Sequence, residues 1–129
     1  MTDKTKGSII QGKDIAFNRL ALENKNTKII ILSHENKKDK LKQRDSGLNE
    51  VLCRLARKND IILAIDLSEL KNKEKKEKAI ILARIIQNIK LIKKFKNKFR
   101  LLNYTNPVQA FSFLINLGLD TNLAKEAVS

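Results

Sequence analysis

Short apolar runs, separated by segments of helical periodicity, limit what this chain can fold into. They occupy residues 29–32, 61–65 and 99–102, and a weaker strand candidate at 8–11 precedes them. Apolar runs of this length are typical of strands buried on both faces of a parallel sheet. The connections between them are long enough for crossover helices, so the spacing predicts an α/β fold with right-handed βαβ units.

The connecting segments carry recognisable helix signals. Asp14 can cap the first helix, Asn106 followed by Pro107 is a typical helix start, and Asp120 or Thr121 can cap a last short helix. The long helix that follows the lysine-rich segment 71–78 should bury Leu82, Ile85, Ile86, Ile89 and Ile92. The predicted helices span about residues 14–23, 47–58, 78–95, 107–117 and 121–128.

The segment 44–58, RDSGLNEVLCRLARK, joins a short polar turn to a helix with arginines. Asp45 or Ser46 can accept the free N–H groups of the first helical turn, and Gly47 allows close backbone approach. We expect these three residues to form a structural turn. The apolar face of the helix is predicted as Leu48, Val51, Leu52, Leu55 and Ala56, with Arg54, Arg57 and Lys58 beside it or opposite.

The length of 129 residues allows one domain. A closed eight-stranded βα barrel needs about 200 residues or more, so any barrel formed here is incomplete. We predict a disordered N-terminal segment at 1–7 and a partial βα barrel at 8–129, with about four parallel βα units and a C-terminal helix. A single cysteine excludes an internal disulfide, no Cys/His spacing suggests zinc, and no signal peptide or membrane span is recognisable. We expect a cytoplasmic protein.

The net charge of +13 is concentrated in one part of the chain. Residues 71–100 hold 12 Lys or Arg against 2 Glu, which is +10 of the total. Such a field attracts polyanions, and RNA is the first partner to consider. The alternative is a lysine-rich composition set by nucleotide bias, which the many Asn and Ile residues also suggest.

Several blocks of this sequence resemble, in order, archaeal ribonuclease P protein component 3. This TIM-barrel-like subunit is related to the thirty-kilodalton protein of the eukaryotic ribonuclease P and MRP particles. The family usually opens with further βα units, so the resemblance implies a barrel truncated at its front. The blocks are NRLALEN with Asn18 and Arg19, ILSH at 31–34, RDSGLNEVLCRLARK, ILAIDLSEL at 62–70, ARIIQNIKLIKK at 83–94, and the Asn106-Pro107 helix with AKEAVS.

The resemblance implies a non-catalytic protein subunit of the particle that removes 5′ leaders from precursor tRNA. The RNA would perform the hydrolysis with its own bound magnesium, and the protein would carry no cofactor, no metal and no catalytic side chain. Implied partners are ribonuclease P RNA, precursor tRNA, and ribonuclease P protein component 2 with the other ribonuclease P proteins.

Arginine binds phosphate through paired hydrogen bonds of fixed geometry, whereas lysine supplies diffuse charge. With 21 Lys and only 6 Arg in the chain, the positions that keep Arg are informative. Surface ion pairs with nearby acids are the equally open alternative for each of them. The RNA-binding residues predicted within the family blocks are Arg19, Arg44, Arg54, Arg57 and Arg84. Lys90 and Lys94 follow Arg84 along the long helix and could extend it into a basic strip.

Two other functions stay open at this point. A metal-dependent phosphoesterase of the histidinol-phosphatase-like barrel class would need several His and carboxylate ligands at the carboxyl ends of the strands. The ends offer the one histidine, His34, with Glu35, Asp45, Asp66 and Asn103. We interpret His34 as a solvated or hydrogen-bonded strand-end residue and Cys53 as a buried structural thiol. A partial barrel that binds RNA nonspecifically through its lysines is the third possibility.

Overall fold

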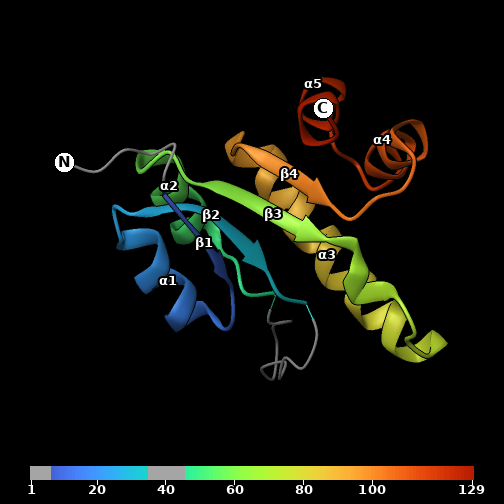
Figure 1. Ribbon diagram of the computed structural model, residues 1–129, viewed down its shortest axis with the longest axis horizontal. Helices are drawn as coiled ribbons and strands as arrows, with labels where there is room; N and C mark the ends of the chain where they lie inside the picture. Colours follow the sequence, from blue (N-terminus) through green and yellow to red (C-terminus); the bar gives the residue numbers. More distant parts are fainter. Residues whose placement is uncertain (1–6, 35–45) are drawn as a thin grey trace.

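The computed structural model describes residues 7–34 and 46–129, which form one sheet with helices around it (Figure 1). The described part has four strands, all parallel, in the order β1-β2-β3-β4. This confirms the predicted α/β class, with four parallel βα units in an open sheet and a C-terminal helix. The elements are β1 Ser8–Gln11, α1 Ile15–Glu23, β2 Thr27–Leu32, α2 Glu50–Lys58, β3 Ile62–Asp66, the 3₁₀ helix η2 Leu67–Leu70, α3 Lys75–Phe95, β4 Phe99–Leu102, α4 Pro107–Asn116 and α5 Thr121–Ala127.

Residues 1–6 lie outside the described part, so the predicted disorder of the segment 1–7 stays a prediction.

The two faces of the sheet differ in how far they are covered. Figure 1 views the sheet with α3 passing behind β3 and β4. Ile30 of β2 and Leu63 of β3 are paired in register, and both are fully buried in the core. Their neighbours Ile29 and Ile62 point the opposite way and are only partly buried, while Ile9 on the edge strand is 63% exposed. The core of this chain therefore lies on one side of the sheet.

Helix α2 begins later than predicted. Its N-cap is Asn49, whose side-chain oxygen accepts from the N–H of Leu52 at 2.9 Å. The expected cap at Ser46 is wrong, because the Ser46 hydroxyl donates to the Leu48 carbonyl instead, and Asp45 lies outside the described residues. Gly47 has φ +77°, a conformation that favours glycine, so residues 46–48 form a turn ahead of the helix. The other predicted caps are confirmed at Asp14, Asn106 and Asp120.

The buried faces of α2 and α3 are rotated slightly from the predicted ones. In α2, Cys53 is fully buried while Val51 is 53% exposed. In α3, Ile81 is buried and Leu82 is only partly so, and the inward face also carries Arg84 and Asn88. Predicting the buried face from the spacing of apolar residues misses this rotation, because that approach places every polar side chain at the surface. Here two polar side chains face inward because buried backbone carbonyls need donors.

Candidate nucleic-acid interface

Two of the predicted arginines lie together where α2 passes the C-terminal end of α3. Arg57 donates through Nη1 to the carbonyl of Phe95 at 2.7 Å, so it caps the last turn of α3. Arg54, one turn earlier on α2, places its guanidinium carbon 5.1 Å from the centre of the Phe95 ring. Both side chains are exposed. The helix packing thus gathers guanidinium groups that the sequence could only place on one helix face.

A lysine from α3 completes this group. Lys94 lies 5.5 Å from the centre of the Phe95 ring, and its Nζ donates to Glu50 Oε1 at 2.7 Å. Glu50 also faces Arg54, with 3.9 Å between Oε2 and Nη2. The hydrogen bond from Lys94 and the charge of Lys94 lower the pKa of Glu50, so the carboxylate is ionised at neutral pH. We call Arg54, Arg57 and Lys94 the basic cluster; Lys90 is exposed on α3 one turn before Lys94.

The remaining predicted residues do not join this cluster. Arg19 is exposed on α1 and pairs with Glu23 of the same helix, with 3.8 Å between Nε and Oε1. Arg44 lies outside the described residues. Arg100, which the family blocks leave out, donates to the carbonyl of Ser129.

Arg84 was predicted on an exposed basic strip, and this prediction is wrong. The residue is only 4% exposed, and its Nη1 donates to the carbonyl of His34 at 3.2 Å. It therefore supports the end of β2 from within the protein. The physical reason is that β2 ends in buried backbone, where a carbonyl needs a donor and the long Arg side chain of α3 supplies it.

His34 and Asn88 lie beside Arg84 and are both fully buried. The Nδ2 of Asn88 lies 2.9 Å from the Nε2 of His34 and 2.9 Å from the carbonyl of Ser46. The Nδ1 of His34 lies 2.9 Å from Glu69, which also accepts the His34 backbone N–H. Because the amide of Asn88 donates to Nε2, the ring proton lies on Nδ1 and is donated to Glu69. His34 is thus the hydrogen-bonded strand-end residue that the sequence suggested.

A further buried amide holds the same turn from the other side. Asn18 of α1 is fully buried, and its Nδ2 donates to the carbonyl of Gly47 at 2.7 Å. We call His34, Arg84, Asn88 and Asn18 the buried polar cluster. It fixes the turn at residues 46–48, and with it the start of α2, against α1, α3 and the end of β2.

Sequence reasoning missed most of the buried polar cluster. Asn88 is spaced four residues after Arg84, within the apolar periodicity of α3, and this spacing is the signal that could have shown an inward polar face. Glu69 carries no such signal, because nothing in the sequence links the 3₁₀ helix after β3 to the end of β2. Phe95 has no sequence signal that marks it as part of a site, although its ring lies against two cations.

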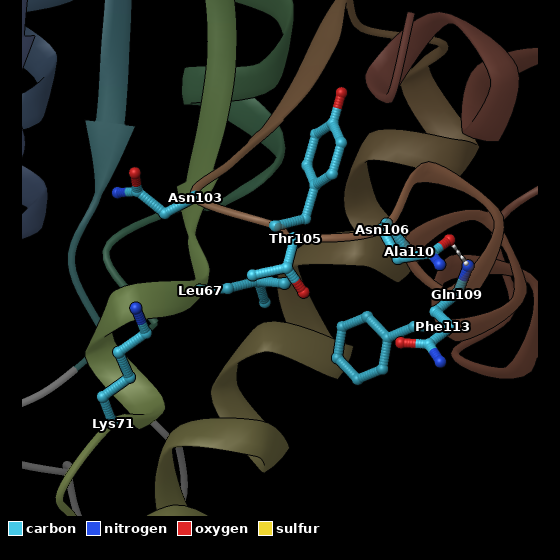
Figure 2. A pocket seen from close by; sticks show the side chains of 9 residues that line it. Leu67, Lys71, Asn103, Thr105, Asn106, Gln109, Ala110 and Phe113 are labelled. Carbon is cyan, nitrogen blue, oxygen red and sulfur yellow. Dashed lines mark hydrogen bonds between the residues drawn. The ribbon is translucent and has the colours of Figure 1, made fainter.

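A pocket of about 280 Å³ opens at the carboxyl ends of β3 and β4, beside the start of α4 (Figure 2). Figure 2 shows Leu67 and the Phe113 ring within it, and the hydrogen bond from the Gln109 N–H to the Asn106 side chain. Its lining includes Lys71 but no histidine or carboxylate, so it does not offer the ligands that a metal-dependent phosphoesterase would use. The lining residues are Leu67, Lys71, Asn103, Tyr104, Thr105, Asn106, Gln109, Ala110 and Phe113.

A carboxylate bonded to one of the lining residues has a structural task. Asp66 accepts from the Nδ2 of Asn103 at 2.7 Å and from the N–H of Ser68 at 2.9 Å, so it caps η2 and ties the ends of β3 and β4 together. Partial burial disfavours the charged form, but these hydrogen bonds outweigh burial and lower the pKa of Asp66. Within residues 7–34 and 46–129, no three His, Cys, Asp or Glu side chains are grouped as metal ligands would be.

Cys53 points into the core from α2. It is fully buried, and burial raises the pKa of its thiol to about 12, with the charge of Glu50 adding to the effect. Such a thiol is protonated at neutral pH and is a poor nucleophile, in agreement with the structural role predicted from the sequence. In the described part of the chain, no helix combines the length and apolar character that a bilayer crossing requires.

Comparison with known proteins finds similarity in both sequence and structure, although no model of a protein family matches the chain. The chain is 27% identical over 128 residues to ribonuclease P protein component 3 of Methanosarcina acetivorans, covering 94% of this chain and 51% of the relative. It also resembles one chain of the cryo-EM structure of archaeal ribonuclease P with mature tRNA, with a TM-score of 0.77 and 28% identity, over 95% of this chain and 53% of that one. Both findings confirm the resemblance to ribonuclease P protein component 3. The chain spans about half the length of each relative.

Proposed function

We propose that this chain is a protein subunit of ribonuclease P, the ribonucleoprotein that removes 5′ leaders from precursor tRNA. The observation that carries the proposal is the match, over 95% of the chain, to a protein chain in an archaeal ribonuclease P bound to tRNA. Similarity to these proteins in both sequence and fold, over the same length of chain, supports a shared role more strongly than either similarity alone.

In this role the protein binds and stabilises the catalytic RNA and contributes no catalytic group. Magnesium on the RNA supplies the chemistry of phosphodiester hydrolysis. The proposed partners are ribonuclease P RNA, precursor tRNA, protein component 2 and the other ribonuclease P proteins, in the cytoplasm. The basic cluster is the part of the described surface best suited to RNA, because Arg54 and Arg57 can bind phosphate oxygens through paired hydrogen bonds.

Arg19, with Lys90 on α3, extends this proposed RNA-binding set beyond the cluster. Both are exposed, so both can meet a phosphate without disturbing the fold. Arg44 is proposed on the family resemblance alone. Arg84 is removed from the set, since its guanidinium is committed to the protein interior.

The decisive experiment is a competition between ribonuclease P RNA and an unrelated folded RNA of equal length, at about 150 mM salt. A specific subunit should prefer ribonuclease P RNA by about tenfold or more, because charge-driven binding alone does not discriminate between RNAs of equal charge. Equal binding of both RNAs would instead support a partial barrel that binds RNA nonspecifically through its lysines.

Activity provides the second half of the test. The particle assembled from its RNA and proteins should cleave the 5′ leader of precursor tRNA more slowly when this chain is left out. The isolated chain should show no phosphoesterase activity without the RNA, with or without added divalent metal. Cleavage that is indifferent to the chain would contradict the proposal.

A further inference from the structure

We infer that Arg54 and Lys94 form a binding site for one RNA backbone phosphate, and that the carboxylate of Glu50 occupies this site in the free protein. The inference rests on the proposed RNA-binding function and adds to it the position of the site and a competing anion built into the chain.

The geometry of the cations is the first argument. Arg54 comes from α2 and Lys94 from α3, yet both reach the same carboxylate, at 3.9 Å and 2.7 Å. Two cations from separate helices that converge on one anionic group form a site of the kind that a phosphate group requires. Phosphate matches it because its oxygens can accept from a guanidinium and an ammonium group at the same time.

The support for these cations is the second argument. The ring of Phe95 lies close to both cations, 5.1 Å from the Arg54 guanidinium and 5.5 Å from the Lys94 ammonium. Attraction to the face of an aromatic ring restricts where each charged group can move. Arg57 donates to the backbone carbonyl of Phe95 and so ties the end of α3 to α2, which keeps the two helices that carry the cations together.

The charge balance is the third argument. Glu50 contributes one negative charge against the three positive charges of the basic cluster, which leaves an excess of positive charge at one point of the surface. Arg19 and Glu23 on α1 offer a contrast, because there one cation meets one carboxylate, also four residues apart. The Glu50 site can therefore accept a second anion or exchange its carboxylate for a phosphate held by more than one cation, whereas the Arg19 pair offers a phosphate a single cation.

Exchange is feasible because all three side chains are exposed. The exposed fractions of the side chains are 65% for Arg54, 62% for Lys94 and 48% for Glu50. Ion pairs at such exposure contribute little to stability, so an incoming phosphate can displace the carboxylate without unfolding α2. The low pKa of Glu50 means that the competing charge is present throughout the neutral pH range.

The test compares Glu50→Gln with Glu23→Gln, using the full chain and ribonuclease P RNA as the probe. Both changes remove one negative charge from an exposed helical carboxylate that lies four residues from an arginine. If Glu50 competes with phosphate, its replacement should tighten RNA binding by about five- to tenfold. Glu23→Gln frees only the single cation Arg19 and should tighten binding by less than about twofold. Thermal unfolding of both variants should stay close to that of the unchanged chain.

A double variant identifies the site. Adding Arg54→Gln to Glu50→Gln should remove most of the gain in affinity, because the cation released by the first change is then missing. Equal gains for Glu50→Gln and Glu23→Gln would overturn the inference and leave only a general effect of charge. Unchanged or weaker binding of Glu50→Gln would also overturn it. Failure of the unchanged chain to bind the RNA at all would instead refute the proposed function.

Discussion

The buried polar cluster and the basic cluster use the same residue type for opposite purposes. Arg84 in the first is 4% exposed and donates to a backbone carbonyl, whereas Arg54 in the second is exposed and faces a carboxylate and an aromatic ring. Both lie in segments that resemble the same protein family, so family membership alone does not separate them. The comparison teaches that a guanidinium group can serve the fold or the ligand, and that its burial decides which.

The largest expected effect is on the free energy of unfolding, where Arg84 and Arg54 should differ most. Arg84→Ala should lower the free energy of unfolding by about 3 kcal/mol, because it leaves a buried carbonyl and its neighbours without a donor. Arg54→Ala should change it by less than about 0.5 kcal/mol, as is usual for an exposed position. Urea unfolding followed by circular dichroism measures both. A stable Arg84→Ala variant that has lost only RNA binding would restore Arg84 to the interface.

Asn88→Ala provides a second test of the buried polar cluster. The amide of Asn88 serves both His34 and the carbonyl of Ser46, so its removal should cost about 2 kcal/mol. Hydrogen exchange should show faster opening of the turn at 46–48 and of the first turn of α2. Lys90→Ala, an exposed change two residues further along α3, is the matched control and should have no comparable effect.

The basic cluster should respond in binding rather than in stability. Replacing Arg54 and Arg57 together by Gln should weaken the binding of ribonuclease P RNA by about tenfold. It should also make the binding less dependent on salt, by about one unit in the logarithmic slope for each phosphate that is no longer neutralised. Arg19→Gln, a change of the same kind outside the cluster, should have a smaller effect. Equally weakened binding at both places would show that affinity follows total charge rather than the cluster.

The smallest expected effect concerns the buried side of α2. The pKa of Cys53 is raised to about 12 in the folded protein, above the value of about 8.5 for an unfolded chain. The stabilisation due to the neutral thiol is therefore complete below about pH 8.5 and is lost as the pH rises toward the folded pKa. Between pH 7.5 and 9 the loss should be about 0.8 kcal/mol. The Cys53→Ala variant should lack this part of the pH dependence, and an identical decline in both proteins would contradict the assignment.

Much of the fold follows from local patterns. The strand at Phe99–Leu102 and the helix at Pro107–Asn116 agree with the sequence to within a residue, because apolar runs, Asn106 and Pro107 act over a few neighbouring positions. The start of α2 was misplaced by about three residues, because Asp45, Ser46 and Asn49 are all acceptable caps and only the turn at Gly47 selects among them.

The site was less predictable than the fold. The sequence indicated which helices carry arginines, but it could not show that Phe95 brings Arg54 and Lys94 together from α2 and α3. It also could not show that Glu69 and Asn88 meet His34, since these contacts join residues 35 and 54 positions apart. Pairings at such distances depend on how the helices pack, and local periodicity carries no information about that.

By itself, the sequence determined the order of parallel βα units, the excess of positive charge and the family that the chain resembles, because each of these is written in residue types and their spacing. The tertiary structure alone decided which cations are available to a ligand. Packing α3 against the sheet buried Arg84 to satisfy the end of β2, and packing it against α2 left Lys94 and Arg54 exposed around a shared carboxylate. The physical reason is that burial and charge pairing depend on neighbours in space, and these are not neighbours along the chain.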